Sequence, residues 1–191
     1  MNTVEKECII EFEEKKSKFI GYIKPVSTKE EAEEFIELIK IKHSDATHNV
    51  SVYRVIDNGK EYFKFDDDGE PSGTAGKPMA EIVNLKDVYN LVVVATRYFG
   101  GIKLGAGGLV RNYAKTAKLA IEEANIVEYI EKVEFIIDFP YSVSGEIDRI
   151  ILSNDIEVLE KTYDARITFK IRVDKAKEGL FDSIKDVIVI K

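Results

Sequence analysis

Cysteine, proline and long apolar runs are scarce in this 191-residue sequence, and each shortage excludes a class of protein. The single cysteine, Cys8, cannot form an internal disulfide and fits a reducing compartment, so we expect a cytoplasmic protein. Four prolines and no low-complexity tract argue against a fibrous or linker-dominated chain. The longest apolar runs, such as 91–95, fall far short of the roughly 20 residues that cross a bilayer. The N-terminus carries acids and is not typical of a signal peptide. We therefore expect no membrane partner.

Acidic residues are absent from one long stretch, Val88–Ile121, although the formal net charge of the chain is −7. This acid-free span carries five basic residues: Arg97, Lys103, Arg111, Lys115 and Lys118. An acidic segment, DDDGE at 66–70, precedes it. The net charge argues against a protein that coats nucleic acid nonspecifically, whereas the local contrast indicates a site. An unevenly sampled mixed-charge surface would give the same pattern.

Hydrophobic periodicity predicts an α+β domain over residues 1–130. Two β-rich runs, 7–12 and 18–23, predict a hairpin, and Asn58-Gly59 predicts the turn of another. Ser27 or Thr28 can cap a helix whose apolar residues share one face: Ala32, Phe35, Ile36 and Ile39. The β-branched run 90–96 predicts a central strand. A helix with a recurring apolar face follows the glycines: Val110, Ala114, Ala117, Ile121 and Ala124.

The remaining residues, 131–191, predict a second domain. Strands are expected at 133–139, 156–161, 166–173 and 187–190, with helices over 143–152 and 175–184. This βαββαβ order is that of a ferredoxin-like sandwich. No linker rich in glycine and serine marks the boundary near residue 130, so we expect the two domains to be closely packed or rigidly joined.

The segment Gly100–Gly108 holds five glycines in nine residues, too many for regular structure. Glycines let a ligand approach the backbone, and a helix N-terminus offers free N–H groups to an anion. We therefore expect phosphate, sulfate or a nucleic-acid backbone to bind the following residues: Arg97, Lys103, Gly105, Gly107, Gly108 and Arg111. A tight strand-to-helix crossing is the alternative. The spacing matches neither the P-loop nor the dinucleotide-binding fingerprint.

The acidic loop before that segment offers oxygen ligands and hydroxyls: Asp67, Asp68, Glu70, Ser72 and Thr74. These acids could bind a hard cation or form a solvated acidic turn. Their spacing is not that of an EF-hand, and we predict no metal and no cofactor. If this loop folds over the glycines, acids, hydroxyls and basic residues meet in one cleft. His48 and Asp68 are then the candidates for general acid–base catalysis.

Four strings resemble the signature of the YigZ/IMPACT family: KKSKFI at 15–20, ATHN at 46–49, DDGEPSGTAGKP at 67–78 and TRYFGGIKLGAGGLVR at 96–111. The resemblance covers residues 1–130, and the rest is similar to the ferredoxin-like C-terminal domain of bacterial YigZ members. It implies a first domain with the β-α fold of a ribosomal-protein domain and of GHMP kinases. The chain lacks the serine-rich part of the GHMP kinase loop. Eukaryotic IMPACT proteins regulate translation, which implies a translational role.

Two functions remain open at this point. The leading hypothesis is a non-enzymatic cytoplasmic regulator or adaptor that binds nucleic acid or a ribosome-associated partner through the glycine loop and the basic span. The alternative is a hydrolase or phosphotransferase that acts on a phosphorylated or peptide substrate in the cleft beside that loop. An enzyme would gather His48, the acids and the basic residues in one pocket, whereas a binding module would spread the basic residues over a face.

Overall fold

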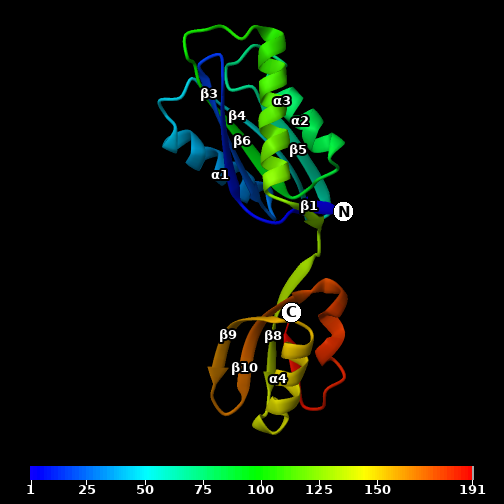
Figure 1. The fold of residues 1–191 in the computed structure, drawn as a ribbon. Coiled ribbons are helices and arrows are strands. Elements are labelled where there is room, and N and C mark those ends of the chain that lie inside the picture. Colours follow the sequence, from blue (N-terminus) through cyan, green and yellow to red (C-terminus); the bar gives the residue numbers. More distant parts are fainter. Residues whose placement is uncertain (191) are drawn as a thin grey trace. The chain divides into compact units, whose positions relative to one another are not determined.

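The computed structural model describes residues 1–190, which divide into two compact units, Met1–Tyr129 and a second unit that begins at Ile130 (Figure 1). Each unit combines helices with a β-sheet and has its own hydrophobic core. The chain is therefore a mixed α and β protein with two units.

A five-stranded antiparallel sheet forms the centre of the first unit, in the order β2-β3-β6-β4-β5. The strands are β2 (Cys8–Glu14), β3 (Ser17–Pro25), β4 (His48–Asp57), β5 (Lys60–Asp66) and β6 (Leu91–Tyr98). The predicted hairpins β2–β3 and β4–β5 are confirmed, and Asn58 and Gly59 both have positive φ in the second turn. The central position predicted for the run 90–96 is also confirmed, because β6 lies between β3 and β4. A small ladder of β1 (Asn2–Val4) with β7 (Ile126–Glu128) joins the two ends of the unit.

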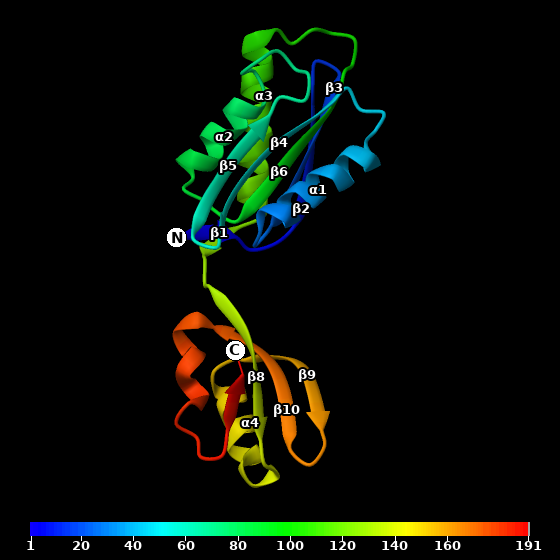
Figure 2. The ribbon, with the colours of Figure 1, turned by 180° about the vertical axis from the view of Figure 1, so that it is seen from behind.

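Three helices cover the two faces of this sheet (Figures 1 and 2). Helices α2 (Gly76–Leu85) and α3 (Ala106–Glu123) pack on one face, over a core that includes Phe19, Met79 and Tyr113. Helix α1 (Lys29–Lys42) packs alone on the other face, over Tyr22, Tyr53 and their neighbours. Its predicted cap is confirmed: the Glu31 N–H donates to the Thr28 hydroxyl over 3.1 Å, and the Glu31 carboxylate accepts from the Ser27 N–H over 2.7 Å.

Helix α3 differs from its prediction in where it starts and in the polar residues that its buried face includes. It begins at Ala106, so Gly107 and Gly108 lie in its first turn rather than in a loop. Ala117 and Ile121 of the predicted face are buried, whereas Val110 is 37% exposed. The buried face also includes three polar residues, Asn112, Tyr113 and Thr116. These polar side chains can be buried because each has a hydrogen-bond acceptor, which an apolar pattern does not register.

The second unit has a four-stranded sheet in the order β11-β8-β10-β9, so the last strand lies beside the first. Its strands are β8 (Lys132–Phe139), β9 (Glu157–Tyr163), β10 (Ile167–Asp174) and β11 (Ile188–Ile190). Helix α4 (Ser144–Ser153) follows a short 3₁₀ turn, η1 (Tyr141–Val143). The α-helix predicted over 175–184 is wrong: this segment forms a 3₁₀ helix, η2 (Lys175–Phe181). Gly179 within it disfavours a longer α-helix.

Candidate functional site

The glycine-rich segment between β6 and α3 is shaped by close approach and by backbone conformation. Gly100 lies against the β2–β3 turn, where an added Cβ would stand 1.7 Å from the Lys16 carbonyl oxygen. Gly105 has φ of 73° and precedes the first residue of α3. Gly107 has no such constraint, since its Cβ would meet only the Arg111 guanidinium, at 3.5 Å. The start of α3 is exposed at residues 105–107.

A buried ion pair joins the acidic loop to the central strand beneath this segment. The Arg97 guanidinium donates to the Glu70 carboxylate over 2.7 Å, and the two side chains are 7% and 3% exposed. Tyr113 of α3 donates its hydroxyl to the same carboxylate oxygen over 2.8 Å. Burial and the neighbouring carboxylate raise the pKa of Tyr113, so its phenol stays protonated. Arg97 also reaches the Ser17 hydroxyl, but its buried Nε has no acceptor among residues 1–190.

His48 lies at the edge of this cluster. Its Nδ1 is 2.7 Å from the Asp68 carbonyl oxygen, which can only accept, so Nδ1 carries the proton. Its Nε2 is 3.7 Å from the second oxygen of Glu70. The carboxylate of Asp68 is engaged elsewhere: it accepts from the Asn49 N–H over 2.6 Å and pairs with Lys40 at 3.3 Å. The backbone carbonyl of Asp68 thus holds His48 beside Glu70, whereas the Asp68 carboxylate fixes the loop.

The other predicted loop residues have structural contacts. Asp67 accepts N–H groups from Gly73, Ala75 and Gly76 over 2.7–3.1 Å and so caps the start of α2. Thr74 donates its hydroxyl to the Pro71 carbonyl over 2.6 Å, and Ser72 is exposed. Across residues 1–190, no group of three or more His, Cys, Asp or Glu side chains is arranged to hold a metal ion.

The acidic loop and the glycine-rich segment share a cavity of about 360 Å³. Arg97 and Glu70 line it together with Thr47, Pro71, Phe99, Lys103, Leu104, Gly105, Ala106 and Leu109. Leu104 also lines a second, smaller pocket of about 170 Å³, which is shared by Glu14, Lys15, Gly108, Arg111, Asn112 and Lys115. Of the predicted anion-binding residues, Arg97, Lys103 and Gly105 therefore lie at the first cavity, Gly108 and Arg111 lie at the second, and Gly107 lines neither.

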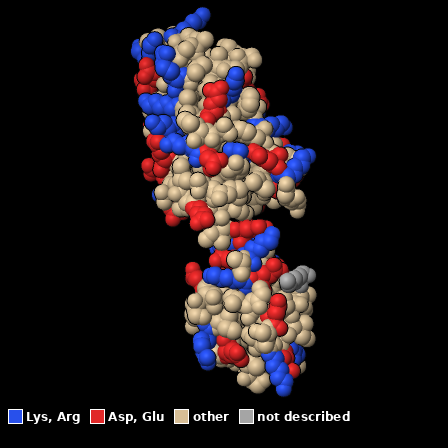
Figure 3. Space-filling view, turned by 90° about the vertical axis from the view of Figure 1, so that its right-hand side faces the viewer, with Lys and Arg blue, Asp and Glu red and all other residues tan. Residues whose placement is uncertain are grey.

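Six exposed cations surround these two pockets and continue along α3. We call them the basic face: Lys15, Lys16, Lys103, Arg111, Lys115 and Lys118. Positions 111, 115 and 118 share one side of the helix. Within the described part of the chain, none of the six has a carboxylate partner within 4 Å, and Lys115 lies over the Phe12 ring. Figure 3 shows Lys and Arg side chains gathered along one edge of the first unit. The arrangement offers an anion a surface with an excess of positive charge, since Glu14 is the one carboxylate that lines these two pockets apart from the buried Glu70.

Sequence reasoning missed Tyr113, Ser17 and Lys15. Tyr113 lies four residues after Leu109 on the buried face of α3, and a search for polar residues at that spacing would have found it. Lys15 and Lys16 have positive φ in the β2–β3 turn, and only the turn's approach to Gly100 places them near the glycines. No helix of residues 1–190 has the length and apolar character needed to cross a bilayer.

Known proteins are similar to this chain over a region that includes the site residues described above. The family model for the Impact N-terminal domain matches residues 15–121. The chain is 39% identical to IMPACT family member YvyE of Bacillus subtilis (strain 168) over 177 residues, 93% of this chain and 79% of that protein. It is 30% identical to IMPACT family member YigZ of Escherichia coli (strain K12) over 170 residues, 88% and 83% of the two chains. A crystal structure described as that of a hypothetical protein is 26% identical, with a TM-score of 0.65 over 99% of this chain and 95% of that one.

Proposed function

The chain belongs to the IMPACT family, as its motifs predicted, and we propose that it is a non-enzymatic regulator or adaptor linked to translation that binds RNA through its basic face. The translational link is taken from the resemblance, in which eukaryotic IMPACT proteins regulate translation. One observation carries the binding role: six exposed cations without carboxylate partners lie on α3, on the loop before it and on the adjacent β2–β3 turn, in a chain whose net charge is −7. The proposed location is the cytoplasm, and a ribosome-associated protein partner is compatible with the same role.

The basic face supports contact with phosphates rather than with base edges. Lysine and arginine side chains on an exposed helix neutralise phosphates and release counterions, which gives affinity without sequence readout. The free N–H groups at the start of α3 add an anion-binding element beside Arg111. Arg97 contributes less to this surface, because Glu70 already neutralises it. The net negative charge elsewhere should keep the binding modest and confined to this face.

Fluorescence anisotropy with a labelled single-stranded RNA tests the proposal. Arg111→Ala should weaken binding similarly for every RNA sequence and flatten the slope of log affinity against log salt by about 0.7. Arg149→Ala is the matched control, since it removes an exposed arginine from α4 of the second unit. No binding of the unaltered protein at low salt, or an equal loss from both variants, would contradict the proposal.

A phosphate titration followed by NMR examines the loop itself. Inorganic phosphate or sulfate should shift the amide signals of Gly105, Gly107 and Gly108 before others, because these residues surround the exposed start of α3. Movement of other amides while these three stay fixed would remove the loop from the binding surface.

The second candidate is an enzyme in the cavity beside the glycine-rich segment. The observation that favours it is that the Glu70 carboxylate lies 3.7 Å from Nε2 of His48 and 2.7 Å from the Arg97 guanidinium, so one carboxylate of the cavity wall meets both side chains. In this case His48→Ala would abolish turnover of a small phosphorylated compound or a peptide, and RNA would have no effect.

The finer fold assignments are part of the proposal. The strand order β11-β8-β10-β9 supports a ferredoxin-like sandwich for the second unit, because that fold also places its last strand beside its first. Assignment of the first unit to the ribosomal-protein and GHMP-kinase-like fold stays a prediction from the resemblance.

A further inference from the structure

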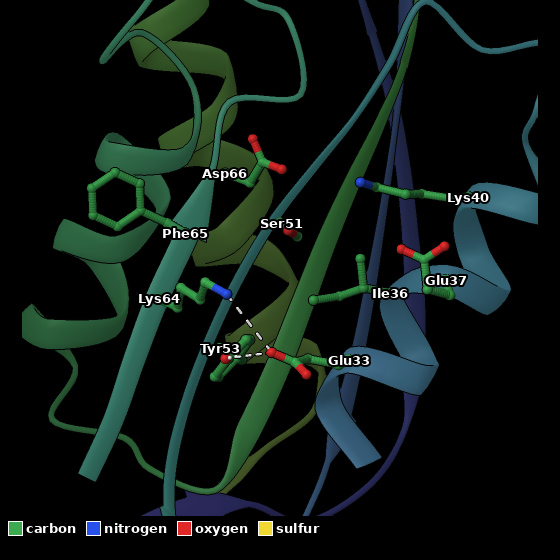
Figure 4. Close-up of a pocket in the computed structure, with 9 residues that line it drawn as sticks. All are labelled: Glu33, Ile36, Glu37, Lys40, Ser51, Tyr53, Lys64, Phe65 and Asp66. Atoms are coloured by element: carbon green, nitrogen blue, oxygen red, sulfur yellow. Dashed lines mark hydrogen bonds and ion pairs between the residues drawn. The ribbon is translucent and has the colours of Figure 1, made fainter. Parts of the chain in front are cut away.

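A second cleft lies on the opposite face of the five-stranded sheet, between α1 and the strands β4 and β5 (Figure 4). Its volume is about 340 Å³, within the range of about 300–1,000 Å³ that is typical of ligand sites. Figure 4 shows Asp66 and Ser51 on the strand side and Lys40 and Glu37 on the helix side. The remaining lining residues are Glu33, Ile36, Tyr53, Lys64 and Phe65. The cleft shares no lining residue with the basic face.

The charged groups of this cleft leave carboxylates without cations. Lys64 lies 3.8 Å from Glu33, and Lys40 pairs with Asp68 at 3.3 Å, so both ammonium groups are matched. Glu37 has no hydrogen bond or ion pair within the described residues. Asp66 accepts only the Asp68 N–H, over 2.9 Å, through one of its oxygens. Glu37 and Asp66 are therefore free to pair with an additional cation.

Ser51 gives a second and independent indication of a ligand. The residue as a whole is 5% exposed, it lines the cleft, and its hydroxyl makes no hydrogen bond to another residue in the part of the chain that the structure describes. Ser51 and Asp66 are directly opposite each other in the β4–β5 ladder, so they share one face of the sheet a few ångströms apart. Burial and the Glu33 carboxylate raise the pKa of Tyr53 to about 12, so its phenol remains a donor to Glu33 and competes for no cation. An unpartnered hydroxyl beside a free carboxylate suits an ammonium or guanidinium group.

The outer side of α1 continues the cleft with apolar surface. Leu38 and Ile41 are 58% and 75% exposed and lie together with Glu33, Glu34 and Glu37 around a shallow depression. Two of these carboxylates, Glu33 and Glu37, also line the cleft, so the two surfaces are continuous. A free polyamine would supply cations but nothing for Leu38 and Ile41 to contact. A polypeptide that carries apolar residues beside a basic one would match both parts.

We propose that this cleft and the outer side of α1 dock a basic, partly apolar segment of a partner protein, with one Lys or Arg side chain inserted between α1 and β5. The inserted cation contacts Asp66, Glu37 and the Ser51 hydroxyl, and its apolar neighbours lie on Leu38 and Ile41. This site is independent of RNA binding, and the first unit would then hold a polyanion on one face of its sheet and a basic polypeptide on the other.

The test uses the full chain and a capped, fluorescein-labelled peptide with Leu-Lys-Leu at its centre, against a Leu-Glu-Leu peptide of the same length. The Lys peptide should bind and the Glu peptide should not. The double variant Glu37→Gln/Asp66→Asn should weaken binding roughly tenfold, since it removes two charge pairs and keeps the Asp66 oxygen that accepts the Asp68 N–H. Ser51→Ala should weaken it roughly fivefold. Glu13→Gln, an exposed acid on β2, is the matched control and should change nothing.

Apolar contact is tested separately. Ile41→Ser should weaken binding of the Lys peptide. Leu152→Ser, which changes an 82% exposed leucine of α4, should not. Spermidine should compete only weakly. The proposal would be overturned if the Lys peptide did not bind, or if Glu13→Gln weakened binding as much as the double variant. It would also be overturned if spermidine bound as tightly as the peptide and Ile41→Ser had no effect. Arg111→Ala should leave peptide binding unchanged. Loss of peptide binding and loss of RNA binding can therefore be distinguished.

Discussion

The two faces of the five-stranded sheet are covered by unequal numbers of helices, and this difference determines which kind of site each face has. Neighbouring strands lie about 4.8 Å apart and a helix with its side chains is about 10–12 Å wide, so one helix covers roughly two strands. Helices α2 and α3 together cover one face, so binding on this side falls to the outer side of α3 and to the pockets at its N-terminal end. Helix α1 lies mainly over β4 and β6, and a cleft stays open towards β5.

The same difference separates the acidic residues of the two faces. On the α2–α3 face, Glu70 is 3% exposed and receives both an arginine and a tyrosine. On the α1 face, Glu33 is 42% exposed and receives a tyrosine and two lysines at 3.7 and 3.8 Å. A buried carboxylate is costly to leave unpaired, whereas an exposed one is screened by water. Glu70 should therefore act in stability and Glu33 in surface charge.

The largest expected effect comes from the buried pair. Glu70→Gln leaves the Arg97 charge buried without its counter-ion and should lower the free energy of unfolding by about 3–5 kcal/mol. Glu33→Gln should lower it by less than about 1 kcal/mol, because its partners are exposed. Urea denaturation of both variants measures the difference. Equal losses of unfolding free energy in the two variants would mean that burial does not determine how much each carboxylate contributes to stability.

Two glycines of the β6–α3 segment should respond in opposite directions. Gly100→Ala places a Cβ on the Lys16 carbonyl, and the forced backbone shift should cost about 1–3 kcal/mol or more. Gly107→Ala fills open space in the first turn of α3 and should stabilise by up to about 1 kcal/mol. Thermal unfolding measures both changes. If Gly107→Ala also weakens RNA binding, Gly107 is needed for close approach of a phosphate. A loss of stability in Gly107→Ala would contradict the expectation that this position prefers alanine because it lies in the first turn of α3.

Local patterns in the sequence predicted most of the strands and the cap of α1, because the alternation of apolar residues and the Thr28–Glu31 pairing act over a few residues. The Asn58-Gly59 turn and the central place of β6 were predictable for the same reason. The apolar part of the buried side of α3 was predictable as well. Its polar part was not, since Asn112, Tyr113 and Thr116 become core residues only through acceptors on the helix itself and on a distant loop.

The candidate site was predictable in composition but not in pairing. The sequence indicated that Arg97 and Glu70 both belong to a site, and the structure shows them joined to each other over 2.7 Å. Of the cations without carboxylate partners, Lys103 and Arg111 were named from the sequence. Lys15 and Lys16 were not, because only the tertiary approach of the β2–β3 turn to Gly100 brings them to the same surface. The cleft beside α1 had no sequence signal, because it arises from the width of a helix relative to a sheet.

The smallest expected effect compares two tyrosines that each donate to a glutamate, Tyr53 on the α1 face and Tyr113 on the other. The pKa of Tyr53 is raised to about 12 by burial and by Glu33, and that of Tyr113 is raised by burial and by Glu70. A raised pKa means that the stability contributed by protonated Tyr53 is complete below its ordinary pKa of about 10 and is lost as the pH rises through about 12.

Alkaline titration, followed by the near-ultraviolet absorbance of phenolate, should therefore show a step near pH 12 that Tyr53→Phe removes. Tyr163→Phe, at a 58% exposed position of the second unit, is the control and should leave that step in place. Tyr113→Phe should also leave it in place, but should lower stability at neutral pH because Glu70 loses a buried donor. If Tyr53→Phe leaves the titration curve unchanged, the phenol is not held against Glu33, and the floor of the α1 cleft is more open to water than its burial implies.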